Sequence, residues 1–207
     1  MIHYRLGKLA DLMLIYPSYA GEFPVDERKT IEQLEKLLAK GDYQLVIAEN
    51  ISPSDEIVRI GFAFVLKPKL YDFLWLDYLV IEKDFQSKGY GSQFFDYLLQ
   101  CYSNIKGMYI EVEIPDGVDV NKTRRVSYYE RLGAIKLPIN YHLPIEKGSM
   151  AMSLYIKPVH HQVSNIDLDE VLMDIKITQR IIHGDYPHLE NVWSNIFINS
   201  PQVPDMI

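Results

Sequence analysis

The segment from Leu79 to Ser92 constrains the fold more than any other part of the chain. It reads as an apolar strand, Leu79-Val80-Ile81, then a short polar turn, then a helix start opened by Gly89 and Gly91. Apolar residues continue at helical spacing as far as Tyr102, so one stripe of this helix is expected to pack on a sheet. A strand that runs through a glycine turn into a sheet-packed helix indicates an α/β architecture.

The glycine turn is typical of a phosphate-binding site. Gly89 and Gly91 let a large anion approach the backbone, because neither carries a Cβ. The N–H groups of the first helical turn point at such an anion, the helix dipole favours its charge, and Lys88 adds a positive charge. Two better-known phosphate-binding motifs are excluded. A P-loop needs a lysine where this chain has Ser92, and a dinucleotide fingerprint needs a third glycine or alanine where it has Phe94. A tight turn without a ligand is the alternative for an isolated glycine pair.

Hydrophobic periodicity predicts strands and helices along the rest of the chain. Strands are expected over residues 2–6, 43–48, 58–66, 73–81, 108–114, 135–137 and 150–156. Helices are expected over residues 8–19, from near Asp26 to about residue 40, and over 91–102, 121–132, 167–183 and 186–198. The stretch between the last two strands is expected to be a loop, since it contains Pro138, Pro144 and Gly148.

The chain changes character at Pro158, beyond which it is acidic and helical. We therefore expect a domain over residues 1–157 and a C-terminal helical extension over residues 158–207. The helix expected over residues 167–183 has one apolar stripe. That stripe can pack on the chain's own domain, form the interface of a homodimer, or wall a substrate pocket. Packing on its own domain is the most economical alternative.

The glycine turn matches a known motif in register. Gln86, Gly89 and Gly91 follow the pattern Gln or Arg, two residues, Gly, one residue, Gly or Ala, and the stretch resembles the coenzyme-binding motif of the GNAT acetyltransferase superfamily. The expected order of elements is also similar, over about residues 1–157. The resemblance implies an α/β fold of the GNAT acyl-CoA N-acyltransferase type, with a central mixed β-sheet flanked by helices and, here, a C-terminal helical extension.

The resemblance also implies an activity, which is acetyl transfer from acetyl-CoA, as co-substrate, to a primary amine by direct attack in a ternary complex. Backbone N–H groups of the turn would bind the CoA pyrophosphate, and the pantetheine arm would pair with the end of the preceding strand, where the family's sheet splays, often at a bulge. The coenzyme-binding residues that it implies are Leu79, Val80, Ile81, Gln86, Ser87, Lys88, Gly89, Tyr90, Gly91 and Ser92. A CoA-binding or sensing module without catalysis, or a transferase of another acyl group, are the alternatives.

Direct attack on a thioester requires a base for the amine, a donor to the oxyanion and an acid for the departing thiolate. Tyr129 resembles the family's acid, a tyrosine four residues before a glycine, here Gly133; a packing tyrosine is the alternative. Asp77 is the first candidate for the base, because related sequences place an acid four residues before the strand's valine position. Glu111 and Glu113 are its rivals, and strand alternation puts both on one face.

Charge and composition exclude some classes of binding partner. The formal net charge is −7, which disfavours a nucleic-acid binder and is compatible with a cationic amine. No apolar run approaches the ~18 residues of a membrane span, so no membrane partner is expected. The single cysteine, Cys101, favours a reducing, cytoplasmic setting and is expected to be buried without a role. No metal is expected, because His160, His161, His183 and His188 lack ligand spacing.

Overall fold

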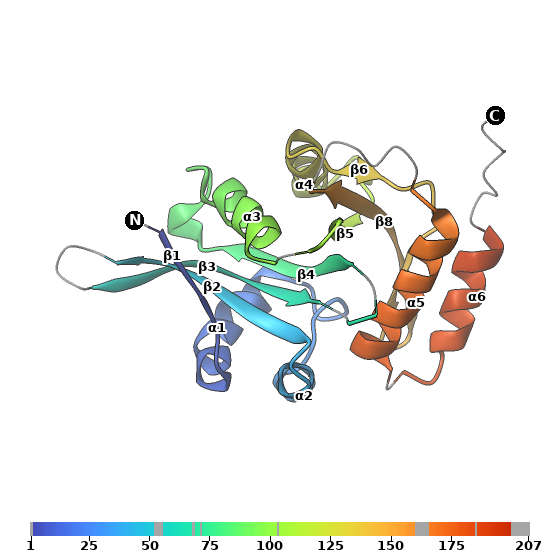
Figure 1. The fold of residues 1–207 in the computed structure, drawn as a ribbon, viewed down its shortest axis with the longest axis horizontal. Coiled ribbons are helices and arrows are strands. Elements are labelled where there is room, and N and C mark those ends of the chain that lie inside the picture. Colours follow the sequence, from blue (N-terminus) through green and yellow to red (C-terminus); the bar gives the residue numbers. More distant parts are fainter. Residues whose placement is uncertain are drawn as a thin grey trace. The chain divides into compact units, whose positions relative to one another are not determined.

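The chain divides into two compact units, Met1–Lys106 and Gly107–Ile207. Both units combine strands and helices (Figure 1), so the expected α/β class is confirmed, and the elements follow the expected order apart from one additional strand near the end of the sheet. The expected division into a domain over residues 1–157 and an extension over residues 158–207, which packs on that domain or at an oligomer interface, stays a prediction. The computed structural model describes residues 2–51, 56–67, 69–70, 72–102, 104–159, 166–184 and 186–199.

Four strands form an antiparallel sheet in the first unit. They pair in chain order and are β1 (Ile2–Leu6), β2 (Tyr43–Ile51), β3 (Ile57–Leu66) and β4 (Phe73–Ile81). The register between β3 and β4 shifts once, since Phe64 lies opposite Tyr78 while Val65 lies opposite Leu76. Asp77 is therefore the additional residue of a β-bulge in β4.

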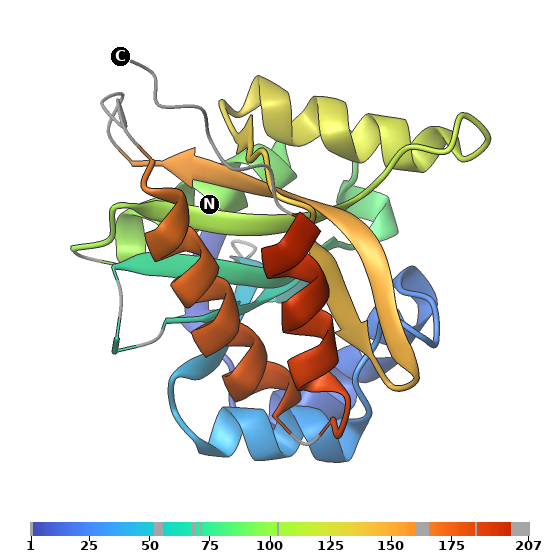
Figure 2. The same ribbon diagram turned by 90° about the vertical axis from the view of Figure 1, so that its right-hand side faces the viewer.

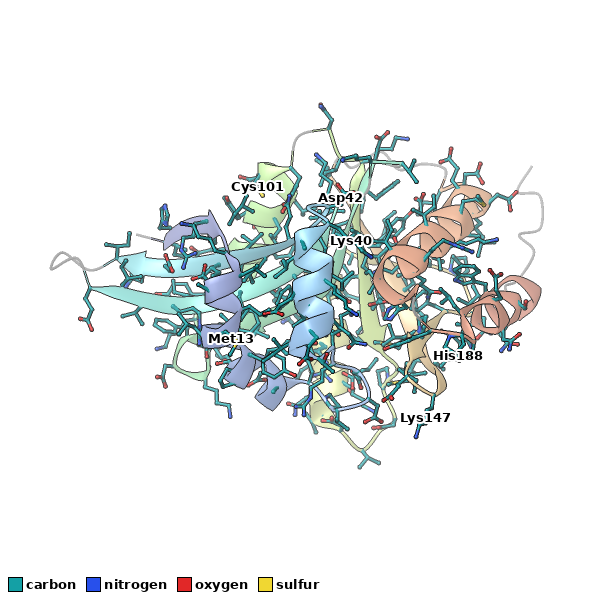
Figure 3. All side chains as sticks on the ribbon, turned by 90° about the horizontal axis from the view of Figure 1, so that it is seen from below. Met13, Lys40, Asp42, Cys101, Lys147 and His188 are labelled. Carbon is teal, nitrogen blue, oxygen red and sulfur yellow. The ribbon has the colours of Figure 1, made fainter. Side chains whose placement is uncertain are left out.

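Helices cover both faces of this sheet. The helices α1 (Leu9–Glu22) and α2 (Ile31–Ala39) lie on one face, and α3 (Tyr90–Cys101) lies on the other (Figures 1 and 3). The expected start of α2 near Asp26 is wrong. Thr30 begins the helix instead, because its hydroxyl accepts from the N–H of Gln33, whose side chain accepts from the N–H of Thr30.

Aromatic side chains fix the helices to the sheet. Tyr19 of α1 packs edge-on against Phe64 and Tyr78, at ring-centroid distances of 5.9 and 4.9 Å. On the other face, Tyr4 of β1 stacks on Tyr97 of α3 at 3.9 Å. The core of the unit therefore lies on both sides of the sheet. Cys101, at the end of α3, is exposed rather than buried as expected (labelled in Figure 3), because it follows the helix's last buried turn.

The second unit is organised around β8 (Gly148–Pro158), which pairs antiparallel with three strands. These strands are β5 (Gly107–Glu113), β6 (Ile135–Lys136) and β7 (His142–Ile145). The strand β7 was expected to be part of a loop. It contains Pro144, which reads as a strand breaker in the sequence, but β7 pairs with β8 alone among the described strands, and a proline is tolerated on such an edge.

Three helices complete the second unit, α4 (Val120–Arg131), α5 (Leu168–His183) and α6 (Leu189–Asn199). The helix α6 packs on α5 and on β7, and Figure 2 shows α5 and α6 side by side. The hydroxyl of Tyr109 on β5 donates to Asp174 of α5 at 2.9 Å. The C-terminal helices thus contact strands of their own chain. No helix in the described ranges is both long and apolar enough to traverse a bilayer.

Candidate functional site

The turn between β4 and α3 has an unusual backbone. A short 3₁₀ turn, η1 (Lys83–Phe85), follows β4, and the chain then passes through Ser87 and Gly89 with φ of +59° and +83°. Gly89 is the N-cap residue of α3. A residue with a Cβ is strained at such φ, so glycine suits position 89 for conformational reasons. Left-handed residues that alternate with right-handed ones also turn backbone N–H groups towards a common side, as in anion-binding nests.

The start of α3 is open. Within the described chain no side chain caps it, because its N-cap residue is a glycine. The N–H of Gln93 bonds the carbonyl oxygen of Gly89 at 3.2 Å, so the N–H groups of Tyr90, Gly91 and Ser92 precede the first intrahelical bond. Such N–H groups, together with the positive end of the helix dipole, form a site for an anion.

Side chains of the turn fold back to hold its shape. The amide of Gln86 donates from Nε2 to the carbonyl oxygen of Ile81 at 2.9 Å, which ties the turn to the end of β4. Lys88 Nζ donates to the carbonyl oxygen of Asp84 at 2.6 Å. Gln86 therefore braces the loop with its side chain, while its own N–H bonds the carbonyl oxygen of Lys83 at 3.3 Å.

A second brace, which sequence reasoning missed, lies directly before the turn. Glu82 accepts from Arg59 Nε of β3 at 2.8 Å and from Ser18 Oγ of α1 at 3.1 Å. Arg59 also donates to the carbonyl oxygen of Leu14 at 3.1 Å. The end of β4 is thus fixed to both a strand and a helix. No local sequence pattern links positions 18, 59 and 82, so this cluster could not be predicted from the sequence.

The strand end expected to receive the pantetheine arm is held close to β3. Leu79 and Ile81 are half-buried, whereas Val80 is buried. Gly61 of β3 lies opposite Ile81, and a Cβ at position 61 would collide with the carbonyl oxygen of Val80. Glycine at this position therefore allows the two backbones to approach each other.

Asp77, the first candidate base, lies in a buried ion pair. Its carboxylate accepts from Lys29 Nζ at 2.9 and 3.2 Å and from the hydroxyl of Tyr43. The Asp77 and Lys29 side chains are only 2% and 5% exposed, and Lys29 also donates to the hydroxyl of Tyr78 at 3.1 Å. Lys29, which lies between α1 and α2, was not anticipated. Its partner is 48 residues away in the sequence.

The two rival carboxylates lie on β5 in the second unit. Glu111 and Glu113 are half-buried on either side of the buried Val112, so they share a face of the strand. Glu111 accepts a hydrogen bond from the hydroxyl of Tyr141, and Glu113 forms an ion pair with Arg125 of α4. Tyr141, which lies between β6 and β7, is a further residue that sequence reasoning missed.

Tyr129, the candidate acid, lies in the last turns of α4, which packs on β5. Burial raises the pKa of Tyr129 to about 12, against the opposing effect of the Arg125 charge. The phenol therefore keeps its proton at neutral pH. Its neighbour Tyr128 packs edge-on against it with 5.0 Å between the ring centroids. Gly133 has a φ of +79° just beyond the helix, as expected of a glycine that ends one.

The described residues contain no group of three or more His, Cys, Asp or Glu side chains able to hold a metal ion. His188, labelled in Figure 3 near Lys147, lies within 2.9 Å of the carbonyl oxygen of Ile145 and fastens α6 to the hairpin of β7 and β8. His183 is buried in α5. His160 and His161 lie outside the described residues.

The structure therefore divides the sequence-predicted site residues between the two units. The first unit contains the glycine turn, the end of β4 and Asp77 in one continuous segment. The second contains Glu111 and Glu113 on β5 and Tyr129 on α4, two elements in contact with each other.

Solved structures share this fold. A Bacteroides thetaiotaomicron protein assigned to the GNAT family of acetyltransferases aligns with 86% of this chain and 96% of its own, at a TM-score of 0.67 and 19% identity. The ribosomal-protein-S18-alanine N-acetyltransferase of Escherichia coli aligns with 81% of this chain and 99% of its own, at a TM-score of 0.57 and 17% identity. Arabidopsis thaliana NAA60 in complex with acetyl-CoA aligns with 75% of this chain and 96% of its own, at a TM-score of 0.55 and 15% identity. No protein-family model and no curated protein sequence matches the chain. The chain has the GNAT fold, as the motif implied.

Proposed function

We propose that this chain is an N-acetyltransferase that moves an acetyl group from acetyl-CoA to a primary amine. The observation that carries the proposal is the uncapped start of α3, where Gly89 in a left-handed conformation follows a bulged strand. The GNAT fold supports it, since structures with this fold include N-acetyltransferases and a complex with acetyl-CoA.

The coenzyme would be held mainly by the backbone. The N–H groups between Gln86 and Ser92 would donate to the pyrophosphate of CoA, each charge-assisted bond contributing roughly 1.5–3 kcal/mol. The pantetheine arm would pair with Leu79 to Ile81 in the manner of an added strand, and the same backbone would donate to the oxyanion. The braces formed by Gln86 and Glu82 support this role, because they fix the turn without occupying its N–H groups.

The reaction needs no covalent enzyme intermediate. The amine nitrogen attacks the thioester carbon, a C–N bond forms, and collapse of the oxyanion breaks the C–S bond. A carboxylate takes the proton that the amine loses, and the departing thiolate takes a proton from the phenol of Tyr129. Exchange with water returns both groups to their starting states, so the products are the N-acetyl amine and free CoA. The phenol of Tyr129, whose pKa burial raises to about 12, is protonated at neutral pH and so can donate.

Among the three candidate bases we favour Glu111. To accept a proton from the substrate, Asp77 would have to release the ammonium of Lys29, which would remain buried without its counter-ion. Glu113 is engaged by the guanidinium of Arg125. Glu111 accepts a hydrogen bond from the neutral hydroxyl of Tyr141, which holds its carboxyl group in place and need not be released when that group takes a proton. Asp77 and Glu113 remain the alternatives.

The acceptor class is a primary amine. The Escherichia coli neighbour is named for an alanine of ribosomal protein S18, which is an amine acceptor of that enzyme. The net charge of −7 favours the approach of a cationic amine to this chain. The single cysteine favours a reducing cytoplasmic setting, and a homodimer formed through the extension is a further proposal.

Two measurements on the full chain test the proposal. Calorimetric titration of acetyl-CoA should show saturable binding, and thiol release from acetyl-CoA should depend on an amine from a panel of polyamines, aminoglycosides and peptides. Binding without thiol release on any amine would favour a CoA-binding module, and faster release from longer acyl-CoA esters would favour another acyl group. The absence of any binding would refute the coenzyme site itself.

A further inference from the structure

A chain of polar side chains connects the C-terminal helices to Glu111. Trp193 of α6 donates from Nε1 to Oε1 of Gln179 on α5 at 2.9 Å, and Nε2 of Gln179 donates to the hydroxyl oxygen of Tyr141 at 3.0 Å. The hydroxyl of Tyr141 in turn donates to Glu111. Trp193, Gln179 and Tyr141 are 2%, 1% and 1% exposed, so these bonds form away from bulk water.

The direction of this chain follows from the chemistry of its first member. An indole N–H can only donate, so Trp193 requires the oxygen of the Gln179 amide to face it. The NH₂ of the same amide must then face Tyr141, whose oxygen accepts from it. With its oxygen engaged as an acceptor, the hydroxyl sends its own proton to the Glu111 carboxylate, which accepts it when ionised. Every donor therefore points from the extension towards β5.

Two further sets of contacts hold the chain rigid. The second proton of the Gln179 NH₂ group bonds the carbonyl oxygen of His142 at 2.9 Å, which fixes the amide to β7. Lys176 and Arg180 of α5 lie over the Trp193 ring, with their charged groups 5.1 and 4.8 Å from its ring system. The α5–α6 pair seen in Figure 2 therefore presents Gln179 in one orientation.

A purely packing role for the extension is served by apolar side chains, which avoid the desolvation cost of buried polar groups. Here three buried polar groups are aligned and end on a carboxylate. We propose that the C-terminal helices position Glu111 for catalysis, with Trp193, Gln179 and Tyr141 as positioning residues that aim its carboxylate. The inference rests on the proposed function, in which Glu111 is the base.

The test compares variants of Gln179 in the full-length chain. In Gln179→Glu, an ionised residue 179 still accepts from Trp193 but cannot donate to Tyr141. The Tyr141 hydroxyl is then expected to donate to residue 179 instead of to Glu111. This variant and Tyr141→Phe should each lower kcat about 10- to 100-fold, with the KM for acetyl-CoA changed less than about 2-fold. Gln179→Met keeps the side-chain volume and leaves Tyr141 free to donate to Glu111, so its kcat should fall less than that of Gln179→Glu.

Two other variants make the comparison robust. Glu190→Gln breaks the exposed ion pair between α6 and Arg180, so it controls for loosening of the two helices and should leave kcat unchanged. Trp193→Phe removes the N–H that orients the amide without introducing a charge, so it replaces Gln179→Glu if that protein fails to fold. A kcat for Gln179→Glu or Trp193→Phe equal to that of Glu190→Gln would overturn the inference.

A spectroscopic readout separates this inference from the proposed function. In protein labelled with ¹³C at tyrosine Cζ, the resonance missing from Tyr141→Phe identifies Tyr141. It should shift in Gln179→Glu, because the hydroxyl changes its acceptor, and stay in place in Glu190→Gln. An unmoved resonance in Gln179→Glu would overturn the proposed direction of the hydrogen bonds, whether or not the parent protein is catalytically active. If the resonance shifts as expected in Gln179→Glu but the parent protein releases no thiol on any amine, the proposed function is refuted instead.

Discussion

Replacing Gly89 with alanine separates backbone strain from coenzyme binding, because the chain contains a matched control. Gly89 and Gly41 both have a φ of +83°. A Cβ at position 89 would have Gln93 Nε2 as its nearest neighbour, at 3.9 Å, and a Cβ at position 41 would have nothing within 4 Å. Neither alanine clashes, so each variant should pay only the left-handed backbone penalty of roughly 1–2 kcal/mol.

The two variants should differ in their affinity for acetyl-CoA. An alanine that relaxes from the left-handed region at position 89 turns the N–H groups at the start of α3 away from their common side. Loss of one charge-assisted hydrogen bond, worth roughly 1.5–3 kcal/mol, weakens the coenzyme Kd by about 10- to 150-fold. Gly41 follows α2, outside the turn, so Gly41→Ala should leave the Kd unchanged.

Thermal unfolding and calorimetry together check this expectation. Each variant should lower the Tm by about 2–8 °C, since 1 kcal/mol corresponds to roughly 2–4 °C for a chain of this length. Only Gly89→Ala should lose affinity, and Gly89→Glu, which adds a negative charge, should abolish binding. Equal Kd values for Gly89→Ala, Gly41→Ala and the parent would refute the assignment of the turn as an anion site.

Three further outcomes are expected. Tyr129→Phe should lower kcat by roughly 10²-fold or more while acetyl-CoA binding persists, and near-normal turnover would remove Tyr129 from the mechanism. Lys29→Met should destabilise the fold by about 3–5 kcal/mol in urea unfolding, because it leaves Asp77 charged and buried; a loss below about 1 kcal/mol would contradict a buried ion pair. The pKa of Asp11 is held at about 2 by Arg5, below its usual range, so its ionised form stabilises the fold by up to ~2.5 kcal/mol above pH ~5. That contribution is lost as pH falls towards 2, so the stability difference between the parent and Asp11→Asn should shrink over the same interval, and a pH-independent difference would contradict it.

The sequence predicts the elements whose signals are local. The spacing of Gln86, Gly89 and Gly91 placed a glycine turn at the start of α3, and alternation placed Glu111 and Glu113 on one face of a strand. Gln86 shows the limit of such a pattern, because its register is visible in the sequence while its side-chain bond to the end of β4 is not.

Features that depend on distant partners were missed. The resemblance implied a bulge near this strand end, but its position at Asp77 depends on the register with β3 and cannot be read from the residues of β4. Lys29 meets Asp77, and Gln179 meets Tyr141, across separations of 48 and 38 residues. In a single sequence, a lysine and a glutamine of this kind read as solvent-facing, since both residue types are usually exposed.

Gly61 is a position at which few substitutions should be tolerated. Because any Cβ there meets the carbonyl oxygen of Val80, substitution would separate β3 from β4 at the stretch of backbone that we propose pairs with the pantetheine arm. A saturation library should therefore retain only glycine at position 61, whether survivors are chosen for folding or for turnover. At position 89, asparagine, which tolerates the left-handed region, should survive a screen for folding more often than one for turnover. Gly61 would then be required by the fold alone, whereas Gly89 would be required by the proposed coenzyme site as well.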